Sequence, residues 1–422
     1  MVTLGSSGAL DAAIESQRDA LCRHLEIEDS GVDVIFSASG TDAQIKALFL
    51  GKSLLGVPLT SVIVGADQTG SGTIHTAQGR HFSDLTASGR MVAEGKPIAG
   101  LADDVRSLRV PFASRDGGFR NAEEMDKAVL AAVAQTVDQD GAVLLQAMDA
   151  SKFGWRAPSD ACLDVIARRW PGQVQVVVDA CQMRLTRARL KSLLARNCIV
   201  LITGSKFFTG PAFSGALLVP KSLGADAIAA APEGLGAYSS CFDWPRGWAI
   251  RAQFAPTPNW GQWLRWEAAL EEMRLYFAVP EFFRDQAQPQ LIGHAQKLFC
   301  ASPGLELLPR DGETIFTFVP HRQGVPLSQD DCRKLHAALS RDCSIPGGED
   351  SHLSALCHIG QPVALEQGGS ALRIALSART IRNCWAEDPA EADARIAAEA
   401  AKLSALVEKL NFLLRHFDAV TP

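Results

Sequence analysis

The sequence predicts an α/β protein with a mostly parallel central sheet and a smaller C-terminal α/β domain. Short apolar runs such as Val176-Val177-Val178 alternate with segments of helical periodicity, which is the pattern of repeated βα units. Polar residues directly follow several of these runs, as expected where ligands bind at the carboxyl ends of parallel strands. The chain of 422 residues is also long enough for two domains.

The amino-terminal elements are a helix, a strand and a second helix. Residues 9–25 show helical periodicity, and residues 32–36 form an apolar strand that enters the segment Ser37-Ala38-Ser39-Gly40-Thr41. A helix over residues 43–55 follows. A strand that enters such a turn before a helix creates an anion site, because the free amides at the helix start point at the ligand. The same segment is also compatible with a simple N-cap.

The remaining elements continue the alternation. We expect strands over residues 61–64, 142–147, 174–178 and 216–219, a strand that closes on Thr203, and helices over residues 122–137, 158–169 and 263–273. From about residue 280 the pattern changes to a separate unit, which ends in an amphipathic helix over residues 388–414. The expected organisation is an N-terminal segment (1–30), a large domain (31–279) and a small C-terminal domain (280–422).

Composition and charge argue against several classes of partner. The formal net charge is −6, from 41 basic and 47 acidic residues, which gives no general field to attract nucleic acid or an acidic membrane. The ten cysteines show no Cys-x-x-Cys pair and no zinc-finger spacing, so we expect no metal site and a reducing compartment. Residues 1–8 lack signal-peptide features, and no run is long enough to span a membrane. A cytoplasmic protein is expected.

Two strand ends carry the residues most informative about function. The run of valines ends in Asp179, and an acid at the edge of a buried sheet requires a partner, which a protonated pyridine nitrogen would supply. The next apolar run closes on Thr203-Gly204-Ser205-Lys206. A lysine presented at the same edge would supply the amine for a Schiff base with an aldehyde cofactor. The pair therefore indicates an aldehyde cofactor site.

This arrangement resembles the pyridoxal-phosphate (PLP) enzymes of fold type I, in particular the class V aminotransferase and cysteine desulfurase superfamily. Its members carry Asp-x-x-Gln, a small polar residue or His before the lysine, and an aromatic loop that contains Gly-Pro. The chain has Asp179-Ala180-Cys181-Gln182, Ser205-Lys206 and Phe207-Phe208-Thr209-Gly210-Pro211. The resemblance spans residues 36–377, and it implies PLP as cofactor and a seven-stranded type of sheet in the large, PLP-binding domain.

The resemblance also implies roles for residues around the cofactor. Lys206 would form the Schiff base and Asp179 would pair with the pyridine nitrogen. Gln182 would lie near the phenolic oxygen. Thr203 and Ser205 would contact the phosphate, although cysteine desulfurases usually have His where Ser205 stands. The phosphate would also be bound by donors in the turn before the second helix, where Gly40 and Thr41 are the matching residues.

Two further positions near the cofactor have open alternatives. Ser151 matches a polar residue three positions before a glycine that approaches the cofactor ring, but it is also compatible with an ordinary turn serine. His75 stands where relatives place a ring over the cofactor. The preceding run, Thr69-Gly70-Ser71-Gly72-Thr73, could equally be a second phosphate-binding turn. A dinucleotide loop is disfavoured, because His75 takes the place of the third glycine.

Two residues are assigned to the partner subunit and the substrate. Thr257-Pro258-Asn259 resembles a segment whose threonine reaches the partner's phosphate, which implies a homodimer with shared active sites, although Pro256 replaces the family's glycine. Arg373 lies inside an apolar β-type run, where a guanidinium is costly unless it meets an anion. In relatives the matching arginine binds the substrate's α-carboxylate, and a structural ion pair is the alternative.

The reaction is less determined than the cofactor. We expect chemistry at the Cα of an amino acid, with Lys206 transferring the proton, and transamination as the default. The first alternative is carbon–sulfur bond cleavage with Cys357 as nucleophile, because one group of desulfurases has its cysteine at almost this distance from the arginine; a buried loop thiol is the other interpretation of Cys357. A decarboxylase or another lyase comes third. A non-catalytic regulator that keeps only the fold is the alternative of a different class.

Overall fold

The computed structural model describes residues 7–114, 117–139, 141–309, 314–344, 351–366 and 368–420. The chain divides into two compact units. The first comprises residues 1–114, 119–152 and 156–274, and the second comprises residues 115–118, 153–155 and 275–422. Helix α1 (Ser7–Leu25) is part of the first unit, where the buried Arg18 donates to the carbonyls of Val34 and Phe242.

The first unit is built on one large sheet, and its mostly parallel character confirms the predicted fold class. The strand order is β1-β8-β7-β6-β4-β2-β3, with β5 paired to β4. Strands β3, β2, β4, β6 and β7 run parallel to one another, whereas β8 is antiparallel to both β7 and β1. The strands are β1 (Val32–Ser37), β2 (Leu59–Val64), β3 (Val105–Val110), β4 (Ala142–Asp149), β5 (Arg156–Ala157), β6 (Val174–Asp179), β7 (Ile199–Thr203) and β8 (Gly215–Pro220).

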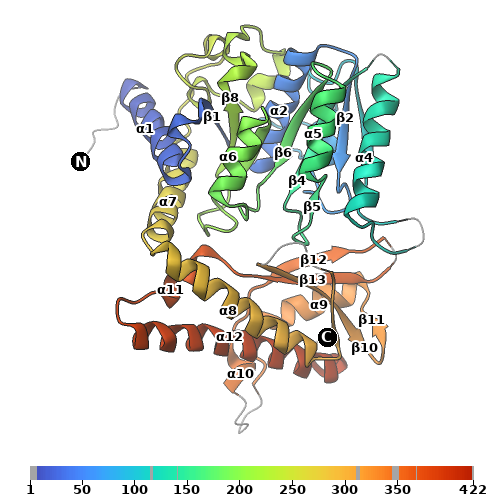
Figure 1. Ribbon diagram of the computed structural model, residues 1–422, viewed down its shortest axis with the longest axis vertical. Coiled ribbons are helices and arrows are strands. Elements are labelled where there is room, and N and C mark those ends of the chain that lie inside the picture. Colours follow the sequence, from blue (N-terminus) through green and yellow to red (C-terminus); the bar gives the residue numbers. More distant parts are fainter. Residues whose placement is uncertain are drawn as a thin grey trace. The chain divides into compact units, whose positions relative to one another are not determined.

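Helices cover both faces of this sheet. Helix α2 (Gly40–Leu55) lies behind the strands in Figure 1, and α4 (Ala122–Val137), α5 (Asp160–Arg169) and α6 (Arg187–Ala195) lie in front. Each of these four begins where a polar N-cap side chain accepts a backbone N–H, as Ser39 does for α2. Because helices shield both sides, all five residues of β7 are buried.

The rest of the first unit consists of short segments and one long helix. Helices α3 (Thr73–Thr76) and α7 (Trp260–Phe277) complete its α-helical content among the described residues. Short 3-10 segments of this unit lie at Glu28–Ser30, Lys221–Leu223, Ala225–Ala227, Glu233–Ala237, Cys241–Asp243 and Ala249–Gln253.

The second unit is an antiparallel sheet packed against helices. Its strands β9 (Leu305–Leu307), β10 (Ile315–Arg322), β11 (Val325–Pro326), β12 (Gly360–Ala364) and β13 (Ser370–Ala375) follow the order β11-β10-β13-β12, with β9 paired to β10. Helices α8 (Glu281–Cys300) and α12 (Pro389–Arg415) run side by side (Figure 1). The other helices are α9 (Gln329–Leu339), α10 (Ser351–Ser354), α11 (Ala378–Cys384) and α13 (Phe417–Val420).

The register of β10 and β13 separates a core face from a polar face. Phe316 lies opposite Ile374 and Phe318 lies opposite Leu372, and all four belong to the hydrophobic core of the second unit. The intervening Arg373 pairs with Thr317. Since successive side chains of a strand point to opposite faces, Arg373 and Thr317 belong to the face turned away from that core.

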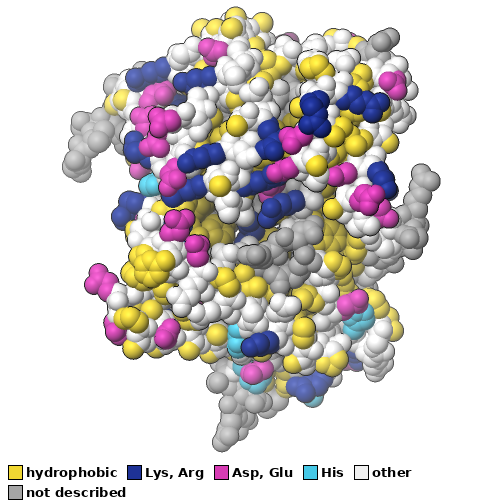
Figure 2. Space-filling view, in the orientation of Figure 1, with side chains coloured by type: hydrophobic (Ala, Val, Ile, Leu, Met, Phe, Trp, Pro, Cys, Tyr) yellow, Lys and Arg dark blue, Asp and Glu magenta, His cyan; other side chains and the backbone are white. Residues whose placement is uncertain are grey.

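Two surface properties bear on possible partners. Figure 2 shows basic and acidic side chains interspersed on the face that α4, α5 and α6 form, where ion pairs such as Arg196–Asp164 are present. This face therefore carries no continuous basic surface of the kind that binds nucleic acid. None of the described helices combines the length and the apolar character that a bilayer crossing requires.

A buried ion pair ties α2 to the segment before α7. The Lys46 Nζ is fully buried and donates to the Phe36 carbonyl at 2.7 Å and to Asp243 Oδ2 at 2.8 Å. Asp243 also accepts from the Ser240 backbone N–H and from Gln262. Removal of one partner of such a pair leaves an uncompensated buried charge.

We predict that Lys46→Met lowers the free energy of unfolding by about 3–5 kcal/mol, because the Asp243 carboxylate would lose its cation. Denaturant unfolding measures the change. The control is Lys127→Met, in which an exposed lysine loses only its surface pair with Glu123, so the transition should not move measurably. Equal transitions for the two variants would contradict the importance of the buried pair.

Candidate functional site

The site is built at the carboxyl edge of the large sheet. Strands β6 and β7 are adjacent and parallel, and Asp179 and Thr203 are their last residues. The Ala180 amide, directly after β6, donates to the Leu201 carbonyl of β7. Strand topology therefore brings Asp179 and the turn that carries Lys206 to the same edge, as the sequence predicted.

The Asp179 carboxylate is half-buried and held from two sides. Its Oδ2 accepts from Gln44 Nε2 at 3.2 Å, and its Oδ1 accepts from the Cys181 backbone N–H at 3.1 Å. Gln44 is held in turn by Thr76, whose hydroxyl donates to Gln44 Oε1 at 2.8 Å. The sequence analysis missed Gln44, and its only signal was a polar residue on a helix that is otherwise largely apolar.

The turn after β7 presents the Lys206 side chain to solvent. Gly204 donates to Ser214 and Gly210 donates to Gly204, so the backbone on both sides of the lysine is fixed. A Cβ at Gly204 would lie 2.5 Å from the Ala269 Cβ of α7, so only glycine permits this packing. The exposed Lys206 side chain therefore extends from a turn whose backbone is held by hydrogen bonds and by packing against α7.

The pKa of the Cys181 thiol depends on burial and on the charges of Asp179 and Lys206. Burial raises its pKa well above the ordinary value, the Asp179 carboxylate raises it further, and the Lys206 cation acts in the opposite direction. The amine of Lys206 and the carboxylate of Asp179 therefore share one electrostatic environment.

The start of α2 is pressed against the ends of β6 and β7. A Cβ at Gly40 would lie 2.7 Å from Cys181 Sγ and 3.3 Å from Thr203 Cγ2. Thr203 donates its hydroxyl proton to the Cys181 carbonyl at 2.7 Å, so this hydroxyl is already engaged as a donor. The first amides of a 16-residue helix thus lie at the edge where Asp179 and Lys206 converge.

The loop after β2, residues 65–73, lies against the start of α2, and we call it the β2 loop. A Cβ at Gly72 would lie 2.7 Å from Thr41 Cγ2, and one at Gly70 would lie 4.0 Å from Thr41 Oγ1. Thr73 is buried, and its hydroxyl has no hydrogen-bond partner among the described residues. This arrangement brings Thr41 and Thr73 together.

Four other predicted residues lie on the same unit. The buried Ser151 donates to Gln68 Oε1 at 2.5 Å, whereas Gln182 and Ser205 are partly buried beside Asp179 and Lys206 in the chain. His75 lies with its Nε2 at 3.5 Å from Glu94 Oε1. The His75 ring therefore has a carboxylate neighbour, and its predicted role over the cofactor remains a hypothesis.

Arg373 belongs to the second unit and is mostly buried in β13. Gly360 makes room for it, because a Cβ there would lie 2.3 Å from Arg373 Cγ. Burial lowers the pKa of the guanidinium, and its Nη1 has no hydrogen-bond partner in the described part of the chain. The hydroxyl of the paired Thr317 has none there either. These orphaned donors favour an anion ligand over the alternative of a structural ion pair.

Cys357 and Thr257 occupy different environments. The half-buried Cys357 packs against the core of the second unit and donates to the Ala355 carbonyl at 3.6 Å. Burial raises the pKa of this thiol, with the Lys409 cation opposing the shift, so the geometry gives no support for a reactive thiolate. Thr257 is exposed, and its carbonyl accepts from the Ser240 hydroxyl at 2.8 Å.

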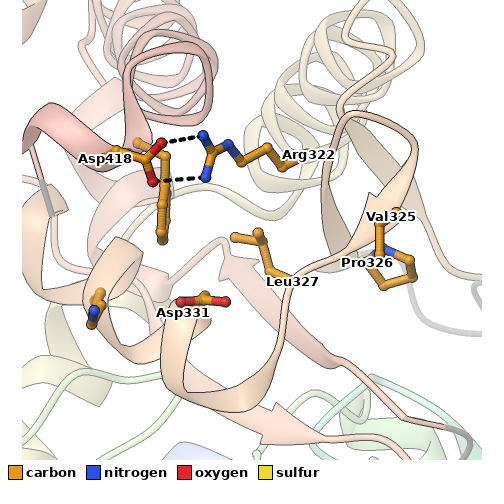
Figure 3. A pocket seen from close by; sticks show the side chains of 8 residues that line it. Arg322, Val325, Pro326, Leu327, Asp331 and Asp418 are labelled. Carbon is orange, nitrogen blue, oxygen red and sulfur yellow. Dashed lines mark hydrogen bonds and ion pairs between the residues drawn. The ribbon is translucent and has the colours of Figure 1, made fainter.

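A pocket of about 450 Å³ also lies in the second unit (Figure 3). Asp418 binds the Arg322 guanidinium with both carboxylate oxygens and raises its pKa. Because this arginine is already paired, it differs from Arg373 and is a poor candidate for a substrate carboxylate. The lining residues are Arg322, Val325, Pro326, Leu327, Asp331, Lys334, Phe417 and Asp418. In the described residues no cluster of His, Cys, Asp and Glu could hold a metal ion.

Comparison with known proteins identifies the fold. No family model and no curated protein matches the chain. A cysteine desulfurase, CsdA of Escherichia coli, is 16% identical with a TM-score of 0.53, and the match covers 96% of this chain and 86% of that one. The glutamate decarboxylase domain of diaminobutyrate-pyruvate transaminase and L-2,4-diaminobutyrate decarboxylase from Vibrio parahaemolyticus is 14% identical with a TM-score of 0.52, over 97% of this chain and 75% of that one.

A third match is TDC of Oryza sativa, solved with PLP and tryptamine. It is 13% identical with a TM-score of 0.52, over 94% of this chain and 77% of that one. At these identities the likeness establishes the fold. The chain therefore has the fold type I architecture that the sequence predicted.

We predict that Gly40→Ala destabilises the first unit by about 1–3 kcal/mol, because the new Cβ would overlap Cys181 Sγ. In a Cys181→Ala background the closest atom is gone, so the same substitution should cost less. Denaturant unfolding of the four proteins of this double-mutant cycle measures the coupling. Gly293→Ala, where the added Cβ meets no atom within 4 Å, is the control. Strictly additive costs at positions 40 and 181 would refute the predicted contact.

Proposed function

We propose that the chain is a PLP-dependent enzyme that acts at the Cα of an amino acid. The observation that carries the proposal is the placement of Asp179 and Lys206 after adjacent parallel strands, where both charges act on the Cys181 thiol. A carboxylate and a primary amine at one strand edge match the two ends of a pyridine aldehyde. The neighbours in fold include enzymes solved with PLP, which agrees with this assignment.

The residues present fit the cofactor. The carboxylate of Asp179 would pair with the pyridine nitrogen, and the exposed amine of Lys206 would hold the aldehyde. The start of α2, with Gly40 and Thr41, would receive the phosphate. The pyridine nitrogen, the aldehyde and the phosphate of the cofactor thus each have a chemically matched group in the first unit.

The protein residues would perform binding, orientation and proton transfer. Bound PLP supplies an electron sink for bonds at the substrate's Cα. Asp179, fixed by Gln44 and by the Cys181 backbone N–H, would present its carboxylate to the ring nitrogen. Lys206 would accept and return the proton at Cα. Arg373 would bind the α-carboxylate, which its orphaned Nη1 supports.

We infer that the functional form is a homodimer with shared sites, in a cytoplasmic setting. Thr257 is exposed, as a residue that reaches a partner subunit must be. Two large apolar side chains of α7 are also exposed, Leu264 at 58% and Trp260 at 37%, and so is Phe213 at 60%, whose ring lies against Arg265 of α7. The cysteine usage of the sequence favours a reducing compartment.

Among the reactions open to this cofactor we propose transamination. The residues described above support proton transfer by Lys206 and carboxylate binding by Arg373, and transamination requires no further protein nucleophile. Carbon–sulfur cleavage through Cys357 is the main competitor, and decarboxylation or another elimination follows.

We predict that the purified protein with PLP is yellow and that borohydride bleaches the colour while it fixes the cofactor to Lys206. Lys206→Ala should abolish the covalent attachment, because no other amine is mounted on the turn after β7. Absorbance and peptide mass spectrometry measure both effects. Lys402→Ala, which changes an exposed lysine of α12, should behave as the wild type. A colourless protein that Lys206→Ala leaves unchanged would overturn the proposed function.

We predict that any release of sulfide from cysteine does not depend on Cys357, because its buried thiol has a raised pKa. Sulfide is assayed after incubation of the holoenzyme with cysteine, for the wild type and Cys357→Ala. Cys343→Ala, a second partly buried thiol against the same core, is the control. Sulfide release that disappears only in Cys357→Ala would establish the desulfurase alternative in place of transamination.

A further inference from the structure

The β2 loop carries two buried donors that the proposed mechanism leaves without an assigned partner in the protein. Gln68 is only 2% exposed and Thr73 only 1%. Neither Gln68 Nε2 nor Thr73 Oγ1 has a hydrogen-bond partner among the described residues. Buried polar groups in folded proteins are nearly always paired, so two such groups on one loop at the edge of the sheet make the loop a candidate for ligand binding.

The orientation of Gln68 is set by Ser151. The Ser151 hydroxyl donates to Gln68 Oε1 at 2.5 Å, which leaves Nε2 as the unpaired end of the amide. An amide nitrogen can only donate, so its ligand must offer an acceptor. Strands β2 and β4 are adjacent and parallel, and β4 is adjacent and parallel to β6, so Gln68 and Ser151 follow strand ends on the same edge as Asp179.

The β2 loop is fixed before any ligand binds. Both carboxylate oxygens of Asp67 accept backbone amides, from Phe112 at 2.8 Å and Ala113 at 3.0 Å. The Thr69 hydroxyl donates to the Ala66 carbonyl, and the backbone N–H of Gln68 donates to the Gly65 carbonyl. Donors on so rigid a loop bind without a large cost of ordering.

The loop also connects the two ends of the proposed cofactor site. At one end Gln68 contacts Ser151, and at the other Gly70 and Gly72 lie against Thr41 at the start of α2. Both neighbours are cofactor residues under the proposed function. The position favours the cofactor over the substrate as the missing acceptor.

We propose that the β2 loop is a second cofactor-binding loop, in which the Gln68 amide and the Thr73 hydroxyl donate to anionic oxygens of bound PLP. This inference rests on the proposed function. It makes Ser151 a positioning residue, which acts by turning the Gln68 amide. Hydrogen bonds to anionic oxygens are among the stronger ones, so loss of either donor should be visible in cofactor affinity.

The test is a titration of the apoprotein with PLP, read by absorbance as a dissociation constant and independent of turnover. Gln68→Met, which keeps the size of the side chain, should weaken PLP binding at least tenfold, and Thr73→Val at least fivefold. Gln175→Met is the matched control, because Gln175 is an equally buried glutamine of the same unit whose Nε2 is already paired with two carbonyls. Thermal unfolding of the apoproteins shows that each variant folds, and Gln68→Glu replaces Gln68→Met if it does not.

Titration of the same variants with pyridoxal, which lacks the phosphate, shows which oxygens of PLP each side chain binds. A further variant tests the role of Ser151. A loss of affinity that persists with pyridoxal assigns that side chain to a ring oxygen, and a loss seen only with PLP assigns it to the phosphate. Ser151→Ala should add little to Gln68→Met. If wild type, Gln68→Met, Thr73→Val and Gln175→Met bind PLP equally, this inference is overturned while the proposed function stands. If the wild type itself binds no PLP, the proposed function is overturned.

Discussion

The parallel alignment of β6 and β7 is the constraint on which the rest of the site depends. Two adjacent strands that run in the same direction must end at the same edge, so Asp179 and the turn of Lys206 are brought together by backbone pairing alone. Chain reversal into β8 then occurs immediately after this turn. The sheet therefore places the acid and the turn that carries the amine at one edge, and side-chain contacts complete the geometry.

Glycines allow the elements around this edge to pack closely. Gly40 and Gly204 stand where a Cβ would overlap the neighbouring element, and Gly72 stands against Thr41. Their small size lets the start of α2, the lysine turn and the β2 loop approach one another closely. The first amides of α2 are thereby placed among side chains that can bind an anion.

The polar groups of the first unit fall into two sets with different purposes. Some are paired within the protein, such as Lys46 with Asp243, and removal of either partner would leave a buried charge uncompensated. Others are held on one side and open on the other, as Gln68 is by Ser151. A half-satisfied buried group lowers the stability of the free protein unless a ligand completes it, which is why such groups mark binding sites.

The sequence by itself determined the fold class, most of the elements and the two strand-end residues. Hydrophobic period and chain order suffice for these, because they depend on local pattern and on the parallel geometry of βα units. The resemblance proposed Gly40, Thr41 and Ser151 as cofactor residues, and all three lie on the first unit. Only the tertiary structure decided that Gln44 donates to Asp179 and that the Thr203 hydroxyl donates to the Cys181 carbonyl. It also decided that Gln68 Nε2 and Thr73 Oγ1 have no hydrogen-bond partner among the described residues. Such facts depend on which side chains meet across distant segments, and neither periodicity nor spacing along one chain encodes those contacts.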